Sequence, residues 1–164
     1  MTTVTTAGDD RERVAELLGR SPMGEFEVVV RRADGDPVVL RNHPLLPDGT
    51  PMPTRYWLCD PALRSAIGTV ESEGGVDEVE AELGLDAIAL VHDHYAADRT
   101  AALPTDHAGP APSGGVGGTR VGVKCLHAHY ANWLAGHDDP VGEWTHHRLI
   151  ERGLLPVDAP ERRA

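Results

Sequence analysis

The chain is poor in the residues on which several classes of protein depend. Among its 164 residues are only two cysteines, Cys59 and Cys125, too few for a disulfide framework, so each is a thiol, a metal ligand or a small buried residue. No apolar run approaches the roughly 18–20 residues that cross a bilayer. The start, MTTVTTAGDD, also lacks the basic and apolar regions of a secretory signal. The sequence therefore predicts a cytoplasmic protein with no membrane partner.

Positive charge is also scarce. The formal net charge is -11, and Lys124 is the single lysine among 15 basic residues. Nucleic acids and anionic membranes attract proteins through basic surfaces, so this composition argues against nucleic acid as a partner. We expect any basic site to be local.

The length fits one domain with frayed ends, because single domains commonly run about 100–200 residues. We expect this domain over residues 9–153, after a disordered tail at 1–8. Residues 103–118 are rich in Pro, Gly, Ala and Ser, which predicts a flexible loop. Residues 154–164 form a C-terminal tail, and its DAPERRA end should be disordered.

Local patterns predict an α+β fold with a small antiparallel sheet. Residues 26–31 and 37–41 are typical of a hairpin, because β-branched residues flank a turn at Asp34-Gly35. After a proline-rich segment, residues 54–59 predict a third strand. About four to five helices should pack against this sheet, over 9–18, 61–72, 76–97 with a break at Gly84, 123–135 and 140–152.

The most unusual stretch is GGVGGTRVGVKCLHAHYANWLAGHDDPVG, residues 114–142. In a helix over 123–135, one face is apolar, with Val123, Leu126, Tyr130, Trp133 and Leu134. The other is polar, with Cys125, His129 and Asn132. Because Lys124 is the only charged residue of this helix, we expect a largely buried central helix whose polar face needs partners.

The same stretch predicts a site for a small anion. Glycine N–H groups before a helix N-terminus favour phosphate or carboxylate, and neighbouring cations add to this. The candidate ligand-binding residues are Gly117, Gly118, Arg120 and Lys124. The motif is not a P-loop, because Val123 precedes Lys124 and Cys125 stands where Ser or Thr is required. A flexible connector that meets a helix is the alternative.

A second polar cluster flanks the proline-rich segment and contains Arg41, His43 and Arg55. Prolines hold such a segment extended and stiff. If the segment folds over the central helix, these residues join the same ligand-binding site. An irregular structural arm is the alternative.

Cys125 and His129 are the candidate catalytic residues, as nucleophile or acid/base, since a helix N-terminus and a nearby ammonium favour a thiolate. A structural cysteine is the alternative. Zinc binding is a weaker hypothesis, in which Cys125 and His129 are joined by His43 or Cys59. Six further histidines are expected to be structural or solvated, namely His127, His92, His94, His137, His146 and His147.

Two blocks, RNHPLLPDGTPMPTRYWL and GGVGGTRVGVKCLHAHYANWLAGHDDPVG, resemble the bacterial domain-of-unknown-function family numbered 501. The resemblance extends from about Val14 to Glu151. It implies no reaction or catalytic residues, because the family has none established. Its members look like gene-order neighbours of enolase, a septum-formation initiator and an exopolyphosphatase-like protein, which implies a link to cell division or phosphate metabolism.

Three functions follow as hypotheses. The first is binding or conversion of a small anionic ligand. The second is a non-catalytic interaction protein with an unknown protein partner, and the third is zinc binding. The sequence by itself names no cofactor.

Overall fold

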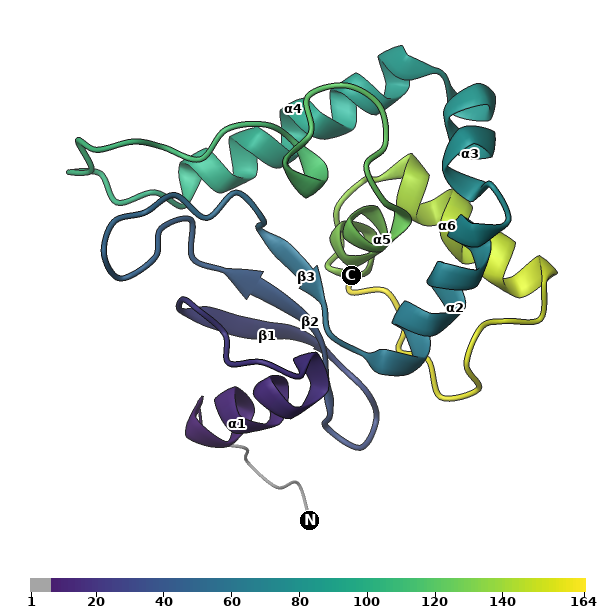
Figure 1. Cartoon of the computed structure of the whole chain (residues 1–164), viewed down its shortest axis with the longest axis horizontal. Helices are drawn as coiled ribbons and strands as arrows, with labels where there is room; N and C mark the ends of the chain where they lie inside the picture. Colours follow the sequence, from purple (N-terminus) through teal and green to yellow (C-terminus); the bar gives the residue numbers. More distant parts are fainter. Residues whose placement is uncertain (1–6) are drawn as a thin grey trace.

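Three antiparallel strands form one small sheet with helices on both sides (Figure 1). The computed structural model describes residues 7–164. The strands lie in the order β1 (Phe26–Arg31), β2 (Pro37–Asn42) and β3 (Tyr56–Leu58). The helices are α1 (Ala7–Leu18), α2 (Pro61–Ser72), α3 (Gly75–Leu83), α4 (Leu85–Ala101), the short 3-10 helix η1 (Val116–Gly118), α5 (Leu126–Leu134) and α6 (Pro140–Glu151). This arrangement confirms the α+β fold.

The two faces of the sheet bury separate apolar clusters. Helix α1 covers one face, where Val14 packs against Leu40 and Cys59 (Figure 1). The other face carries Val39 and Leu58 into the larger core beneath the remaining helices. The sheet is therefore the middle layer of the molecule.

Helix α5 lies in the larger core beside β3, as expected for a central helix. Leu126, Tyr130 and Leu134 of its predicted apolar face are fully buried. Burying such a side chain contributes about 1.5–3 kcal/mol. The helix begins at Leu126, three residues later than predicted, because Cys125 has the extended backbone of an N-cap residue with φ -154°.

Capping residues set the other helix boundaries much as the sequence predicts. Asp60 caps α2 by accepting from the Leu63 N–H, and Pro61 stands at the first helical position. Gly84 separates α3 from α4, with a φ of 80° that favours glycine. Asp139 caps α6 and accepts from the N–H groups of Val141 and Gly142.

A buried histidine on α4 holds the glycine-rich loop, residues 114–124, at two points. His92 Nε2 donates to the Gly122 carbonyl at 2.7 Å, and Nδ1 accepts from the Val116 N–H at 3.0 Å. A Cβ at Gly115 would lie 2.3 Å from His92 Nδ1, so only glycine fits there. His92 is therefore a buried structural residue and not the solvated one that the sequence suggested.

Arg99 fixes the same loop from a position about two turns further along the same face of α4. Its guanidinium donates to the Pro53 carbonyl at 2.8 Å and to the Gly114 carbonyl at 2.7 Å, and the residue is 1% exposed. It thus joins the proline-rich segment to the end of the loop at 103–118. Hydrogen bonds to buried side chains hold that end, although its composition predicts a flexible loop.

The ends of the chain differ from the expected tails. Helix α1 already includes Ala7 and Gly8, and residues 1–6 of the expected N-terminal tail lie outside the described residues. At the other end, Leu154 and Leu155 pack against the larger core, and the Arg163 N–H donates to the Leu134 carbonyl at 2.8 Å. Apolar side chains and a free carbonyl at the end of α5 thus order this segment. Within residues 7–164, none of the helices combines the length and apolar character needed to span a bilayer.

Candidate functional site

A pocket of about 300 Å³ lies between β3 and the start of α5, and we call it the α5 pocket. Helix α2 and the glycine-rich loop complete its walls. The lining residues are Thr54, Tyr56, Trp57, Leu58, Arg64, Gly117, Lys124, Cys125, His127 and Ala128. The structure therefore brings Gly117, Lys124 and Cys125 of the predicted site together.

The charge of the α5 pocket is positive. Lys124 and Arg64 are exposed residues that line it, and neither side chain forms a hydrogen bond or ion pair with another described residue. Among the described residues that line the pocket, none carries a carboxylate. Both cations are thus available to a ligand.

His127 is protonated, as the geometry of its ring requires, and its charge is balanced by the carboxylate of Glu71. Nδ1 lies 2.6 Å from Glu71 Oε1, and Nε2 lies 2.9 Å from the Arg64 carbonyl. Both partners are acceptors, so both ring nitrogens must carry a proton. Burial by itself lowers the pKa of His127, but hydrogen bonds to Cys125, Glu71 and the Arg64 carbonyl together raise it to about 10.

The two cysteines have opposite surroundings. Cys125 is partly exposed in the α5 pocket, whereas Cys59 is fully buried. Burial raises the pKa of the Cys59 thiol to about 12, so it is chemically inert at neutral pH. Both nitrogens of His127 are already engaged, which leaves that ring without a free lone pair to act as a base for Cys125.

The glycine-rich loop shapes the pocket, but several of its amides have internal partners. The N–H groups of Gly115, Gly118 and Thr119 donate to carbonyls within the loop. This differs from our expectation that the loop amides face an anion. Gly117 contributes in another way, because a Cβ there would lie 3.4 Å from Lys124 Cβ and Cδ, so the loop packs against the lysine stem.

Two predicted ligand-binding residues of the loop lie apart from this pocket. Arg120 and Gly118 are exposed, and neither belongs to its lining. Arg120 is therefore a suitable control, because it is a cation of the same loop that lies outside the pocket.

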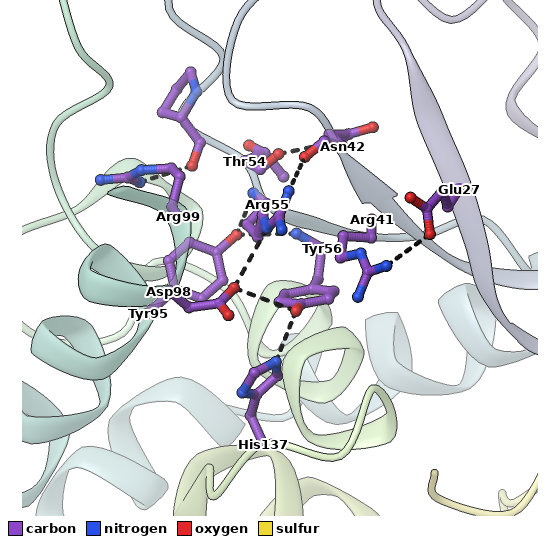
Figure 2. Close-up of polar contacts among 11 residues, drawn as sticks. Glu27, Arg41, Asn42, Thr54, Arg55, Tyr56, Tyr95, Asp98, Arg99 and His137 are labelled. Atoms are coloured by element: carbon purple, nitrogen blue, oxygen red, sulfur yellow. Dashed lines mark hydrogen bonds and ion pairs between the residues drawn. The ribbon is translucent and has the colours of Figure 1, made fainter. Parts of the chain in front are cut away.

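The second predicted cluster lines a different pocket, of about 420 Å³. Arg41, His43 and Arg55 lie there together with the acidic Glu25 and Glu27. The Arg41 guanidinium lies 2.6 Å from Glu27 Oε2, as Figure 2 shows. The proline-rich segment thus does not fold over the start of α5, and its charges are largely compensated.

Figure 2 also shows how Arg55 is used within the protein. Its guanidinium donates to the Asn42 carbonyl at 2.7 Å and lies 3.3 Å from Asp98 Oδ2. The Tyr56 hydroxyl bonds to the same carboxylate and to His137 (Figure 2). These contacts connect β3 to α4 and to the turn after α5.

His129 lines neither pocket and is fully buried. Its Nδ1 lies 2.9 Å from Asp139 Oδ2, which also accepts from Asn132 Nδ2 at 3.0 Å. The polar face of α5 therefore finds its partner in the cap of α6, and His129 does not meet Cys125 in a shared pocket. Nε2 of His129 has no partner among the described residues.

The candidate zinc ligands occupy separate places. Cys125 lines the α5 pocket, His43 lines the second pocket, and His129 is buried against Asp139. Over residues 7–164, no group of three or more His, Cys, Asp or Glu side chains is placed to hold a metal ion.

A comparison with protein families matches residues 28–147 to a family described as "Protein of unknown function (DUF501)". The match covers most of the chain. The protein belongs to this family. The resemblance carried by the two sequence blocks is thereby confirmed. No curated protein matches the chain, and no solved structure matches it.

Sequence reasoning missed two residues of the α5 pocket, namely Arg64 and His127. Arg64 is an ordinary exposed residue of α2, about 60 positions from Lys124, and no local pattern marks it. His127 looked structural, since its charge depends on Glu71 and the Arg64 carbonyl, which come from another helix. No local signal in the sequence reveals either role.

Proposed function

We propose that the α5 pocket binds a small ligand that carries a carboxylate or a phosphate. The observation that supports this is the meeting of Lys124 and Arg64, two cations whose side chains have no partner among the described residues, in a pocket lined by no carboxylate. The protein as a whole carries a net charge of -11, so this local excess of positive charge runs against its composition.

The surroundings of these cations strengthen their attraction for an anion. Leu58 is buried and Ala128 is half-buried, and both line the same pocket. Charges interact more strongly beside such apolar groups than in bulk water, because the local dielectric is lower. Arg64 can also offer two parallel N–H groups to one carboxylate or phosphate.

Cys125 is the candidate nucleophile of this pocket. Its half-buried side chain lies on the lining beside Lys124, where a bound ligand would meet it. His129 has no part in the proposal as acid or base, because it is buried beside Asp139. Binding is thus the primary function proposed, and chemistry at Cys125 depends on it.

Alkylation of Cys125 tests the proposal directly, because Cys59 is fully buried and the native protein offers one accessible thiol. The rate of reaction with iodoacetamide should fall when a panel of phosphorylated and carboxylated metabolites contains a ligand. The same compound should raise the melting temperature by mass action. Lys124→Ala and Arg64→Ala should each weaken protection about tenfold, since a hydrogen bond to a charged group contributes about 1.5–3 kcal/mol.

Arg120→Ala is the matched control, because it removes a cation from the same loop but outside the pocket. Protection of Cys125 in this variant should stay within about twofold of that in the wild type, as expected for the loss of an exposed charge. Equal weakening by Arg120→Ala and Lys124→Ala would contradict a specific site. Failure of every anion to slow alkylation would end the proposal.

A further inference from the structure

The free edge of the sheet borders the α5 pocket. Strand β3 pairs with β2 alone, so its other edge has no neighbouring strand among the described residues. Three consecutive residues of β3 line the pocket, whereas no described residue of β1 or β2 does. The pocket therefore lies along the unpaired edge.

The hydrogen bonds at the ends of β3 fix which backbone groups face that edge. The Cys59 N–H donates to the Val38 carbonyl at 2.9 Å, and the Asn42 N–H donates to the Arg55 carbonyl at 2.7 Å. Bonded pairs alternate along an antiparallel ladder, so residues 55, 57 and 59 face β2. The backbone groups of Tyr56 and Leu58 then point the opposite way.

One of these groups already has a partner. The Tyr56 N–H donates to the Tyr95 hydroxyl at 3.1 Å. The Tyr56 carbonyl and the N–H and carbonyl of Leu58 have no partner among the described residues. Both residues are nevertheless buried, at 3% and 4% exposure. Buried backbone groups are nearly always paired, so one donor and two acceptors on this edge are left for a partner.

We infer that the ligand of the α5 pocket is the C-terminal end of an extended peptide, which adds to β3 as a further strand. This inference rests on the proposed anion site and specifies its ligand. One peptide residue can donate its N–H to the Tyr56 carbonyl and accept the Leu58 N–H with its own carbonyl. The terminal carboxylate then meets Lys124 and Arg64 beside the strand.

A simple anion satisfies only part of this pocket. Acetate can accept from Lys124, Arg64 and the Leu58 N–H, but it has no proton to donate to the Tyr56 carbonyl. Hydrogen phosphate has a P–OH donor, but it lacks the regularly spaced N–H and carbonyl groups of an extended peptide. A peptide end supplies the donor, the acceptor and the negative charge at once. Edge strands are natural templates for this kind of addition, and charged residues beside them select what pairs.

Three pools of N-acetylated tripeptides test the inference with the full-length protein. The first pool ends in a free carboxylate, the second is amidated at the C-terminus, and the third has N-methylated backbone amides with a free carboxylate. Sodium acetate and inorganic phosphate are the simple anions. The free-carboxylate pool should protect Cys125 from iodoacetamide at a concentration at least about tenfold lower than any other probe, a difference of about 1.4 kcal/mol.

Hydrogen exchange gives a second measurement that needs no substitution in the strand. The free-carboxylate pool should slow exchange of the Leu58 amide at least about tenfold, and the N-methylated pool should slow it less, since blocked donors weaken strand addition. Lys124→Ala should reduce both effects, whereas Arg120→Ala should preserve them.

The outcomes separate this inference from the proposal beneath it. If acetate or phosphate protects Cys125 as well as the peptides do, the peptide inference is overturned and the anion site stands. Equal protection by the free-carboxylate and N-methylated pools, or an unchanged Leu58 exchange rate, also overturns strand addition. If no probe protects Cys125, the anion site and the peptide inference both fall.

Discussion

The positive charge of His127 depends on two contacts of its ring. Glu71 and the Arg64 carbonyl accept from its two nitrogens, and the carboxylate of Glu71 also accepts from the Leu126 N–H at 3.2 Å. One acidic side chain of α2 thus pairs with the imidazolium and caps the first turn of α5. At the residue scale, a histidine without an obvious role becomes a fixed cation.

This pair predicts a specific dependence of stability on pH. The pKa of His127 is about 10 in the folded protein, above the ordinary value of 6.5 for histidine. Because folding raises this pKa, protonation of His127 stabilises the fold fully below pH 6.5. This contribution to the free energy of unfolding is lost as the pH rises toward 10. The free energy of unfolding of the wild type should therefore exceed that of His127→Gln by about 1–3 kcal/mol near pH 6, and the gap should shrink by pH 10.

Urea denaturation across this pH range measures the effect. Glu71→Gln should remove most of the same pH dependence, because it removes the acceptor charge that stabilises the imidazolium. A gap between wild type and His127→Gln that stays constant from pH 6 to pH 10 would show that the ring is not a cation in the folded protein.

Helices α5 and α6 are joined by one carboxylate. Asp139 accepts from the N–H groups of Val141 and Gly142, from His129 Nδ1 and from Asn132 Nδ2. The two helices also approach closely, since a Cβ at Gly142 would lie 2.6 Å from the His129 carbonyl. At the element scale, the polar face of α5 is a structural joint between helices.

Removal of this carboxylate should destabilise the protein strongly. Asp139→Ala loses a helix cap, worth about 1 kcal/mol, and leaves buried donors without an acceptor, at about 1–3 kcal/mol each. We expect the free energy of unfolding to fall by at least about 3 kcal/mol in urea denaturation. Asp138→Ala is the control at an exposed neighbour and should change it by less than about 0.5 kcal/mol. Similar losses for both variants would contradict this role.

At the scale of the whole molecule, α4 holds together segments that are distant in sequence. His92 reaches the glycine-rich loop, and the Tyr95 hydroxyl accepts from the N–H groups of Arg55 and Tyr56. Arg99 connects the proline-rich segment with the end of the loop. One face of this helix therefore positions both β3 and the loop that carries Lys124.

Loss of Arg99 should loosen both segments at once. Arg99→Met keeps much of the apolar stem but leaves the half-buried carbonyls of Pro53 and Gly114 unpaired, which costs about 1–3 kcal/mol for each. Urea denaturation should show a loss of about 2–4 kcal/mol, and limited proteolysis should cut residues 103–118 faster. Arg148→Met removes surface ion pairs with Glu78 and Glu151 and should cost less than about 1 kcal/mol. Unchanged proteolysis of Arg99→Met would contradict the linking role.

Local chemistry in the sequence is enough to predict most elements of this fold. The turn at Asp34-Gly35, the caps Asp60 and Asp139 and the break at Gly84 act within a few residues, so their patterns are visible in the chain. The burial of α5 was also predictable, because Lys124 is the only charge near it. The start of α5 was placed too early, since periodicity cannot detect a cap supplied by Glu71 from another helix.

The candidate site was decided by tertiary packing. Lys124 and Cys125 were predicted, but Arg64 and His127 joined them through the packing of α2 against α5. Packing also places His129 against Asp139, and it places Arg41, His43 and Arg55 in a separate pocket. Sequence patterns report the conformational preferences of neighbouring residues, whereas the sign of charge in a pocket and the free edge of a sheet depend on which distant segments meet.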